Sequence, residues 1–278
     1  MPAKIIDGTA IARKIRENIK KKVRELSFTP GIAFVLVGNN PASQIYVEHK
    51  QRACREVGFF SKNIRLEGNI DELELLRVVD ELNQENKIQG IIVQLPLPSH
   101  INSQLIIDSI LPHKDADGIN PINIGNMVVG NNLITPATPK GVIKLIESTG
   151  ITIDGKHAVV LGRSNIVGKP LSMLLLQKNA TVSICHSHTK NIEELTKSAD
   201  ILVSAIGKPK FVTADMVKSG AVVIDVGTTR EGSKLIGDVD FEEVRKVAGY
   251  MTPVPGGVGP MTIAMLLENT LECIGLKR

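Results

Sequence analysis

Hydrophobic residues in the first half of the chain follow two periodicities. Apolar residues recur every four positions from Ile11 to Val23, which predicts an amphipathic helix over 9–26. Further helices are predicted around Tyr46 and over 71–85. Short apolar runs predict buried strands at 31–38 and 90–96, and the alternating stretch 63–67 predicts a weaker strand. Strands that alternate with helices are typical of crossover units and a parallel sheet.

A long segment, 112–137, interrupts this alternation because it is rich in Gly, Asn and Pro. We interpret it as an irregular functional or linking segment, with a domain boundary at its end. The alternation then restarts, with helices expected between four predicted strands: 157–162, 181–187, 199–207 and 221–227. The pattern therefore predicts two α/β domains, the second of about the size that a nucleotide-binding fold needs.

Composition narrows the classes of partner. The 278 residues suffice for two domains, and the net charge of +4 comes from 33 basic and 29 acidic residues without a long basic run. We therefore expect no nucleic-acid partner. No apolar stretch reaches the ~18 residues of a membrane helix, and the first residues lack a secretory apolar region. Three scattered cysteines fit a reducing compartment, so we expect a cytoplasmic protein without a membrane partner.

The stretch "VVLGRSNIVGKP" follows a predicted strand and opens a predicted helix, as a dinucleotide-binding fingerprint does. Gly162 permits a tight turn, and Gly168 permits close packing of the helix on the strand. Ser164 replaces the usual middle glycine. The stretch predicts a pyrophosphate site, although the two glycines also fit a plain strand–helix turn.

The end of the next strand, "CHSHTK", indicates which dinucleotide is bound. NAD-preferring folds usually carry an acidic residue there, which binds the ribose 2′-hydroxyl, and this stretch has none. A 2′-phosphate suits the hydroxyl and basic residues found there instead, together with Arg163 of the phosphate loop: His186, Ser187, His188 and Lys190. His186 and His188 could also form a metal pair, but no acidic residue lies in this stretch to complete a metal site. We therefore expect NADP as cofactor and no metal.

Tyr46 and Lys50 are four residues apart, which places both on one face of a helix. With "YVEHK" and "GRSNIVGKP", three further stretches closely resemble the bifunctional methylenetetrahydrofolate dehydrogenase/methenyltetrahydrofolate cyclohydrolase family of the bacterial FolD type: "QLPLP", "KDADG" and "PVPGGVGPMT". The resemblance runs from about residue 5 to the last predicted helix.

This resemblance implies a homodimer of two α/β domains, the second Rossmann-like and NADP-binding, with the folate substrate in the cleft between them. It also implies that the last helix returns to the first domain. The expected folate-binding domain is thus 1–137 plus 261–278, and the expected NADP-binding domain is 138–260.

The resemblance also implies roles for individual residues. Lys50 corresponds to the family's catalytic lysine, Tyr46 to its substrate-stacking tyrosine, Gln94 to the glutamine that orients the lysine, and Asp117 to the pterin-binding aspartate. Ser43 matches the serine ahead of the tyrosine. Composition alone would make Asp117 part of an Asp-Gly turn, and Gln94 a polar residue at the end of a strand.

Further positions match the family's cofactor and substrate loops. The cofactor contacts correspond to Gly162, Arg163, Ser164, Ser187 and Thr228, where Thr228 replaces the commoner isoleucine. The loop that faces the folate corresponds to Pro255, Gly256 and Gly257, although a plain loop before a helix would also use this composition.

The implied activity has two steps. Oxidation of 5,10-methylenetetrahydrofolate needs mainly alignment with the nicotinamide, and hydrolysis of the methenyl product to 10-formyltetrahydrofolate needs proton transfer, for which a lysine with a lowered pKa is suited. Two other classes of protein share part of this pattern. A short-chain dehydrogenase also has Tyr-x-x-x-Lys, but there the glycine loop precedes it, whereas here it follows. A folate-binding protein without activity would have lost Lys50 or Gln94, and both are present.

Overall fold

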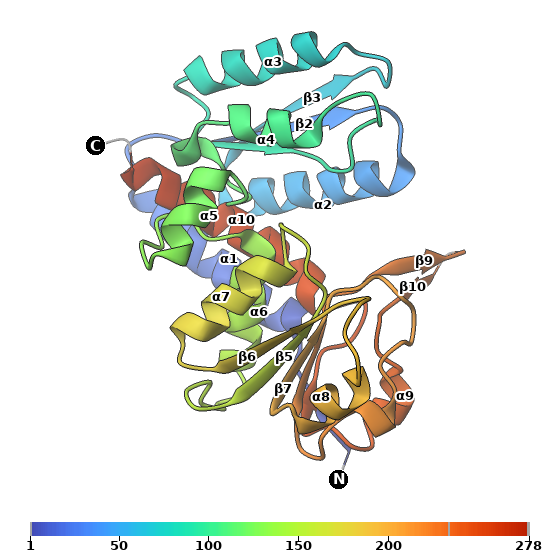
Figure 1. Ribbon diagram of the computed structural model, residues 1–278. Coiled ribbons are helices and arrows are strands. Elements are labelled where there is room, and N and C mark those ends of the chain that lie inside the picture. Colours follow the sequence, from blue (N-terminus) through green and yellow to red (C-terminus); the bar gives the residue numbers. More distant parts are fainter. Residues whose placement is uncertain (1, 233, 277–278) are drawn as a thin grey trace. The chain divides into compact units, whose positions relative to one another are not determined.

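The computed structural model describes residues 2–232 and 234–276, and its internal contacts divide the chain into two compact units (Figure 1). The six-stranded unit comprises the chain up to Ala12 together with Thr138–Thr262. The three-stranded unit comprises Arg13–Ala137 and the chain from Ile263 onward. The chain therefore passes between the units three times.

The three-stranded unit contains a parallel sheet in the order β3 (Phe60–Leu66), β2 (Gly31–Val37) and β4 (Gly90–Val93). The central strand β2 is buried at every position, which explains its uninterrupted apolar sequence. The helices of this part of the chain are α1 (Gly8–Glu25, which begins in the other unit), α2 (Pro41–Val57), α3 (Glu72–Gln84), α4 (Ser103–Ser109), α5 (Pro121–Val128) and α10 (Val258–Gly275, which also begins in the other unit).

The segment 112–137 is more ordered than its composition predicts. It contains a 3-10 helix, Pro112–Lys114, and the eight-residue helix α5. The Asn120 side chain accepts a hydrogen bond from Ile122 N at 2.8 Å and caps α5, with Pro121 in the first turn. The prediction of an irregular segment was wrong here because a residue pair typical of turns, Asn-Pro, also begins helices.

The six-stranded unit contains one sheet in which every pairing is parallel. Its order is β1 (Lys4–Ile5), β11 (Tyr250–Met251), β8 (Val222–Asp225), β7 (Ile201–Ser204), β5 (His157–Leu161) and β6 (Thr181–Cys185). If β5, β6, β7, β8 and β11 are numbered 1 to 5 along the chain, their order in the sheet is 2-1-3-4-5, as in doubly wound nucleotide folds. The strand order therefore reverses between β5 and β7. Ligands of such sheets bind beside that reversal, at the carboxyl ends of the strands.

The remaining elements of this unit are the helices α6 (Ala137–Glu147), α7 (Gly168–Gln177), α8 (Ile192–Ser198) and α9 (Phe241–Val244), a 3-10 helix Ala214–Met216, and the antiparallel hairpin of β9 (Thr229–Glu231) with β10 (Lys234–Ile236). The connection from β7 to β8 thus holds only a 3-10 helix, where the alternation predicted an ordinary helix. The predicted strands run one to three residues past the carboxyl ends of the observed strands.

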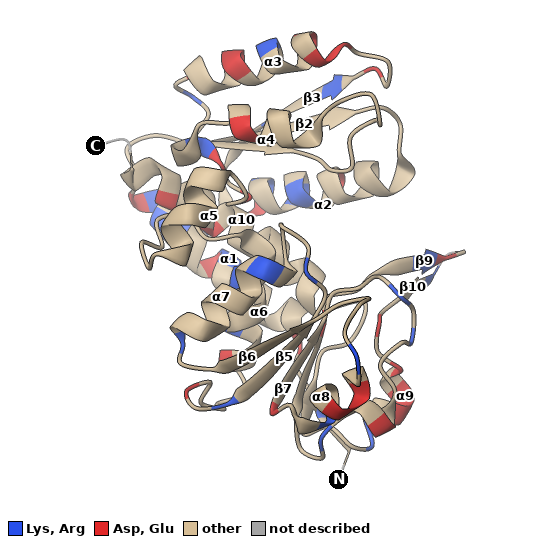
Figure 2. Cartoon of the chain, in the orientation of Figure 1, with Lys and Arg blue, Asp and Glu red and all other residues tan. Residues whose placement is uncertain are grey.

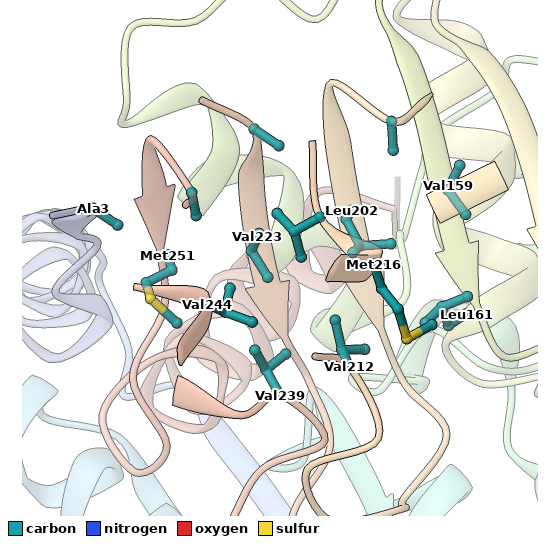
Figure 3. Close-up of a cluster of buried hydrophobic side chains, with 14 of the residues drawn as sticks. Ala3, Val159, Leu161, Leu202, Val212, Met216, Val223, Val239, Val244 and Met251 are labelled. Atoms are coloured by element: carbon teal, nitrogen blue, oxygen red, sulfur yellow. The ribbon is translucent and has the colours of Figure 1, made fainter. Parts of the chain in front are cut away.

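Apolar side chains from neighbouring strands form the core on one face of this sheet (Figure 3). Val159, Leu202 and Val223 are at most 1% exposed and pack with Val212 and Met216 of the β7–β8 connection. Each such side chain stabilises the fold by roughly 1.5–3 kcal/mol on burial. The core therefore fixes the strands whose carboxyl ends carry the expected cofactor residues.

The first residues of the chain belong to this core as well. Strand β1 pairs with β11, and Ala3, 5% exposed, lies in the same cluster as Met251. The sequence expectation placed residues 1–12 with the rest of 1–137, whereas their contacts group them with 138–262. A strand of two residues has no periodicity, so the pattern of apolar residues did not reveal it. Among the described residues, no helix is long and apolar enough to cross a membrane.

Candidate active site

Helix α2 carries three of the expected substrate-site residues on one face. Asn40 Oδ1 accepts hydrogen bonds from Ala42 N at 3.0 Å and Ser43 N at 3.1 Å, which fixes the start of the helix. Ser43, Tyr46 and Lys50 follow at spacings of three and four residues, so they share a face. Ser43 is buried, Lys50 is half-buried and Tyr46 is 40% exposed. An exposed phenol ring on this face is available for stacking.

The Lys50 side chain meets Gln94, which directly follows β4. Lys50 Nζ donates to Gln94 Oε1 at 3.0 Å, and Gln94 Nε2 donates to the Leu95 carbonyl at 2.7 Å. Because the amide nitrogen is bound to a backbone carbonyl, the amide oxygen points at the amine. Gln94 thereby orients the lysine without adding a charge beside it.

Asp117 lies in a turn that other buried groups hold in place. The Asp115 carboxylate accepts hydrogen bonds from Gly118 N at 3.0 Å, Asn120 N at 2.7 Å and Asn123 Nδ2 at 2.9 Å. Gly118 has φ +72°, and a Cβ there would lie 2.6 Å from the Thr135 backbone. Only glycine fits this position, so the Asp-Gly turn is real.

Helix α10 supports the same turn from the other side. Asn269 Nδ2 donates to the Ala116 carbonyl at 2.9 Å and to the Thr135 carbonyl at 2.8 Å. The backbone on both sides of Asp117 is thus fixed, while its side chain remains half-buried. The sequence interpretation left the role of Asp115 open and did not single out Asn269, because an isolated polar residue in an apolar helix gives no indication of its partner.

Lys50 and Asp117 influence each other's protonation. Burial lowers the pKa of Lys50, and the negative charge of Asp117 acts in the opposite direction. Burial likewise raises the pKa of Asp117, and the Lys50 charge opposes that shift. Burial raises the pKa of Cys54, one turn after Lys50, to about 12, so this thiol is neutral at neutral pH. The Lys50 amine can therefore transfer a proton at a pH nearer neutrality than a free ammonium group could.

The expected phosphate loop joins β5 to α7. Gly162 has φ +114°, and a Cβ there would lie 2.4 Å from the Ala205 carbonyl oxygen. A Cβ on Gly168 would lie 2.2 Å from the Gly162 carbonyl oxygen. The structure confirms that these two glycines permit a tight turn and a close helix–strand approach.

Ser164 binds the backbone at the start of the helix that follows this loop. Its Oγ accepts hydrogen bonds from Val167 N at 3.2 Å and Gly168 N at 3.3 Å. The hydroxyl hydrogen remains available to a phosphate oxygen, and the exposed loop residues Arg163 and Asn165 lie beside it. The loop therefore fits the pyrophosphate of a dinucleotide at a helix N-terminus.

The other expected cofactor residues lie at the carboxyl ends of neighbouring strands. Ser187 follows β6 and Thr228 follows β8, and both are exposed. His186 Nδ1 accepts a hydrogen bond from His188 N at 3.2 Å, and their rings meet edge to face. Among the residues that the structure describes, no group of three or more His, Cys, Asp or Glu side chains could hold a metal ion.

The loop with Pro255, Gly256 and Gly257 belongs to the six-stranded unit. Thr9 N donates to the Gly256 carbonyl at 3.0 Å, and Gly256 has φ +105°. This loop is thus fixed by the start of α1. Lys50, Gln94 and Asp117 come together within the three-stranded unit, and a cleft that combines them with this loop stays a prediction.

Models of one enzyme family match both parts of the chain. The catalytic domain of tetrahydrofolate dehydrogenase/cyclohydrolase matches residues 6–117, and the NAD(P)-binding domain of the same family matches residues 136–278. The bifunctional protein FolD of Moorella thermoacetica is 54% identical over 276 residues, which are 98% of this chain and 99% of that protein.

Solved structures agree with these matches. The bifunctional FolD of Campylobacter jejuni is 47% identical, with a TM-score of 0.97 over 99% of this chain and 100% of that one. The Trypanosoma brucei methylenetetrahydrofolate dehydrogenase–cyclohydrolase, complexed with an NADP cofactor and an inhibitor, is 40% identical, with a TM-score of 0.95 over 100% of this chain and 99% of that one. These matches confirm the resemblance inferred from the sequence motifs: the chain belongs to the tetrahydrofolate dehydrogenase/cyclohydrolase family.

Proposed function

We propose that the chain oxidises 5,10-methylenetetrahydrofolate to 5,10-methenyltetrahydrofolate with NADP and then hydrolyses the product to 10-formyltetrahydrofolate. Membership of the family supports both activities. The observation that carries the proposal is the hydrogen bond from Lys50 to Gln94, because it orients an amine whose pKa is lowered by burial.

In the oxidation, this chain's residues mainly align the substrate. Tyr46 stacks on the flat ring system, and Asp117 accepts hydrogen bonds from the amino-pyrimidine edge of the pterin. Ser43 and the loop Pro255–Gly257 complete the substrate contacts. The bound nicotinamide supplies a hydride acceptor, and the protein's task is to keep the one-carbon bridge facing it.

In the hydrolysis, Lys50 moves the proton. As the neutral amine it takes a proton from the water that attacks the methenyl carbon, and as the ammonium it returns that proton to the nitrogen that leaves the carbon. The remaining hydroxyl proton is released to solvent as the C–OH group becomes the formyl carbonyl. A cationic substrate lowers the pKa of Lys50 further, which favours the neutral amine at the moment of attack. Gln94 keeps the amine directed throughout.

The choice of NADP rests on the residues that would hold its 2′-phosphate. Arg163 and Ser187 are exposed beside the phosphate loop and at the end of β6, and no acidic residue stands between Cys185 and Lys190. An acidic residue there would repel a phosphate. Gly162, Ser164 and Thr228 complete the proposed cofactor contacts.

A homodimer in the cytoplasm is part of the same proposal. The dimer rests on the family resemblance, and the location rests on the composition of the chain. Sedimentation equilibrium at several protein concentrations tests the dimer, and a monomer at every concentration would contradict it.

The activity is tested by replacing the proton-transfer group. We expect Lys50→Gln to lower the rate of methenyltetrahydrofolate hydrolysis by about 10²–10⁴-fold while measurable NADP-dependent dehydrogenase activity remains, because hydride transfer needs alignment more than a proton acceptor. Lys62→Gln, which changes a lysine of β3 that pairs with Glu85, is the matched control and should retain both activities. Wild-type hydrolysis by Lys50→Gln would refute the proposed mechanism.

A further inference from the structure

Two aspartates lie buried at the carboxyl edge of the six-stranded sheet, whose strands are almost free of charge (Figure 2). Asp225 is the last residue of β8, and Asp238 follows β10. Their exposures are 4% and 0%. Charged groups so deeply buried need several hydrogen bonds to remain there. Neither residue has a part in the chemistry described above.

Asp238 binds the loop that follows β7. Its Oδ2 accepts hydrogen bonds from Ile206 N at 2.8 Å and Gly207 N at 3.2 Å, and its Oδ1 accepts one from Lys208 N at 2.8 Å. Ser204 Oγ, at the end of β7, donates to Oδ2 at 2.9 Å. One carboxylate therefore holds three successive backbone N–H groups and fixes the path of this loop.

This loop adjoins the phosphate loop. Ala205 N donates to the Leu161 carbonyl at 2.8 Å, and the Ala205 carbonyl oxygen is the atom that excludes a side chain at Gly162. The loop therefore lies at the reversal of strand order, on the side of β5 away from β6. The adenosine half of a dinucleotide belongs at the end of β6 and the pyrophosphate at the start of α7, so the nicotinamide half belongs at the ends of β7 and β8.

Asp225 holds Asp238 in turn. Asp225 Oδ1 accepts hydrogen bonds from Asp238 N at 3.0 Å and Gly227 N at 3.1 Å, and Oδ2 accepts one from Val239 N at 2.9 Å. The same carboxylate thus fixes both the segment that carries Asp238 and the turn that leads to Thr228.

Two glycines make this close approach possible. A Cβ on Gly227 would lie 2.0 Å from the Asp238 carboxyl group, and a Cβ on Gly237 would lie 2.0 Å from Asp225 Oδ2. No side chain larger than hydrogen fits at either position. The backbone at Gly227 and Gly237 therefore packs directly against the two carboxylates.

Four donors converge on Asp238, and this explains why the residue is an acid. A carboxylate offers about four acceptor sites on two oxygens and no hydrogen. Asparagine would keep one acceptor oxygen and turn an amide N–H₂ toward a backbone N–H. Hydrogen bonds to an ionised acceptor are also about twice as strong as neutral ones.

We propose that Asp238, anchored by Asp225, is a positioning residue for the nicotinamide half of the dinucleotide, because it fixes the loop Ile206–Lys208 that lines this half of the site. The inference rests on the proposed dinucleotide-dependent activity and adds a residue outside the known motifs. Loss of Asp238 should therefore affect the nicotinamide half of the ligand and spare the adenosine half.

The test compares two ligands by calorimetry on the full-length protein: NADP, and adenosine 2′,5′-bisphosphate, which lacks the nicotinamide half. For Asp238→Asn we expect about a tenfold rise in the dissociation constant of NADP and less than a twofold change for the bisphosphate. Hydrolysis of methenyltetrahydrofolate, whose proton-transfer group lies in the other unit, should change less than twofold, while the KM for NADP in the dehydrogenase reaction rises.

Asp240→Asn is the matched control. It makes the same chemical change two residues along the chain, on a side chain that does not cap α9. It should leave both dissociation constants unchanged. An equal weakening of both ligands in Asp238→Asn would reduce Asp238 to a general structural residue, and unchanged NADP binding would overturn the proposal outright.

Two outcomes call for a further experiment: a misfolded Asp238→Asn variant, and a wild type that prefers NAD. If Asp238→Asn lacks the wild-type circular dichroism spectrum, Ser204→Ala decides, since it removes one of the four donors: we expect a two- to threefold rise for NADP alone, and no change would overturn the proposal. If the wild type binds NAD and AMP in place of NADP and the bisphosphate, the cofactor proposal fails by itself. The same comparison is then made with NAD and AMP.

Discussion

At the scale of single residues, the site depends on Lys50, whose pKa is shifted in opposite directions by two causes. Burial lowers the pKa of Lys50, and the Asp117 carboxylate raises it. Asp117 therefore has two effects in the proposed mechanism: it binds the pterin, and it keeps the amine from losing its proton too readily. These two effects are separable by experiment.

The first prediction concerns the pH dependence of hydrolysis. Asp117→Asn removes the charge that raises the pKa of Lys50, so that pKa falls further and the neutral amine persists at lower pH. The limb of the kcat/KM profile on which hydrolysis rises with pH should move to lower pH, even as the KM for the folate increases. A profile measured with the uncatalysed rate subtracted checks this.

Asp80→Asn, at an exposed position on α3, is the control and should leave the profile in place. A limb that stays fixed in Asp117→Asn, or moves to higher pH, would show that Lys50 does not govern it.

The second prediction concerns the choice of dinucleotide. We expect kcat/KM to favour NADP over NAD by at least about tenfold, or ~1.4 kcal/mol. The double variant Arg163→Ala, Ser187→Ala should lose most of this preference, since it removes the groups proposed for the 2′-phosphate. Steady-state rates with each dinucleotide decide, and Lys197→Ala on α8 serves as the control. An unchanged preference in the double variant would show that other residues determine the selectivity for NADP.

At the scale of helices and strands, the sequence patterns predicted the long elements well. The strands β2, β5, β7 and β8 were recognisable because burial on both faces requires an uninterrupted apolar run. Some short elements were not predicted: β1 and β11 have two residues each, and α5 lies in a segment of turn-forming composition. Their formation depends on tertiary partners, which a local pattern does not contain.

The candidate site shows the same division. Tyr46 and Lys50 were found from helical spacing, and Gly162 and Gly168 from their place between a strand and a helix. The family resemblance was needed for Gln94 and Asp117, because an amide after a strand and an Asp-Gly turn are common without function. Asp238 was missed, since its donors lie about 30 residues earlier in the chain.

The third prediction concerns the helix within the supposed linker. Asn120 caps α5, and its Nδ2 also donates to the Ile107 carbonyl at 3.3 Å and the Ile110 carbonyl at 2.9 Å. Asn120→Ala loses the cap and leaves buried carbonyls without their donor, at a cost of roughly 2–4 kcal/mol in the free energy of unfolding. Urea unfolding measures this.

The matched control is Asn102→Ala at the start of α4, an exposed cap that binds Gln104 N and Leu105 N. It should cost only about 1 kcal/mol. Equal losses at the two caps would mean that the buried carbonyls near Asn120 find other donors.

At the scale of the whole molecule, neither unit is a continuous piece of the chain. The six-stranded unit takes its edge strand from the first residues and the other five strands from 157–251. The three-stranded unit takes part of α10 from the last residues, and Asn269 of that helix fixes the turn beside Asp117. Each unit is therefore complete only with a distant segment.

The fourth prediction follows for the first residues. Deletion of residues 2–6 removes the hydrogen bonds from Ala3 N to Arg245 O, Lys4 N to Gly249 O and Ile6 N to Met251 O, together with two buried side chains. We expect the free energy of unfolding of the six-stranded unit to fall by roughly 3–6 kcal/mol. This loss should be measurable as a lower melting temperature and weaker NADP binding. Ile5→Ala, which keeps the strand and trims an exposed side chain, should change neither. Unaltered melting of the deletion variant would contradict the structural role given to β1.

The pairing of Lys4 with Tyr250 also has a consequence for biosynthesis. Lys4 precedes Tyr250 by 246 residues (250 − 4), so β1 leaves the ribosome long before β11 and has no partner strand until that stretch of chain is made. Domains generally fold as units during synthesis, at ~5–20 residues per second, and an unpaired strand is prone to aggregate in the interval. β1 has only two residues, one of them a lysine, and this brevity makes it a poor template for other chains until its own sheet is ready.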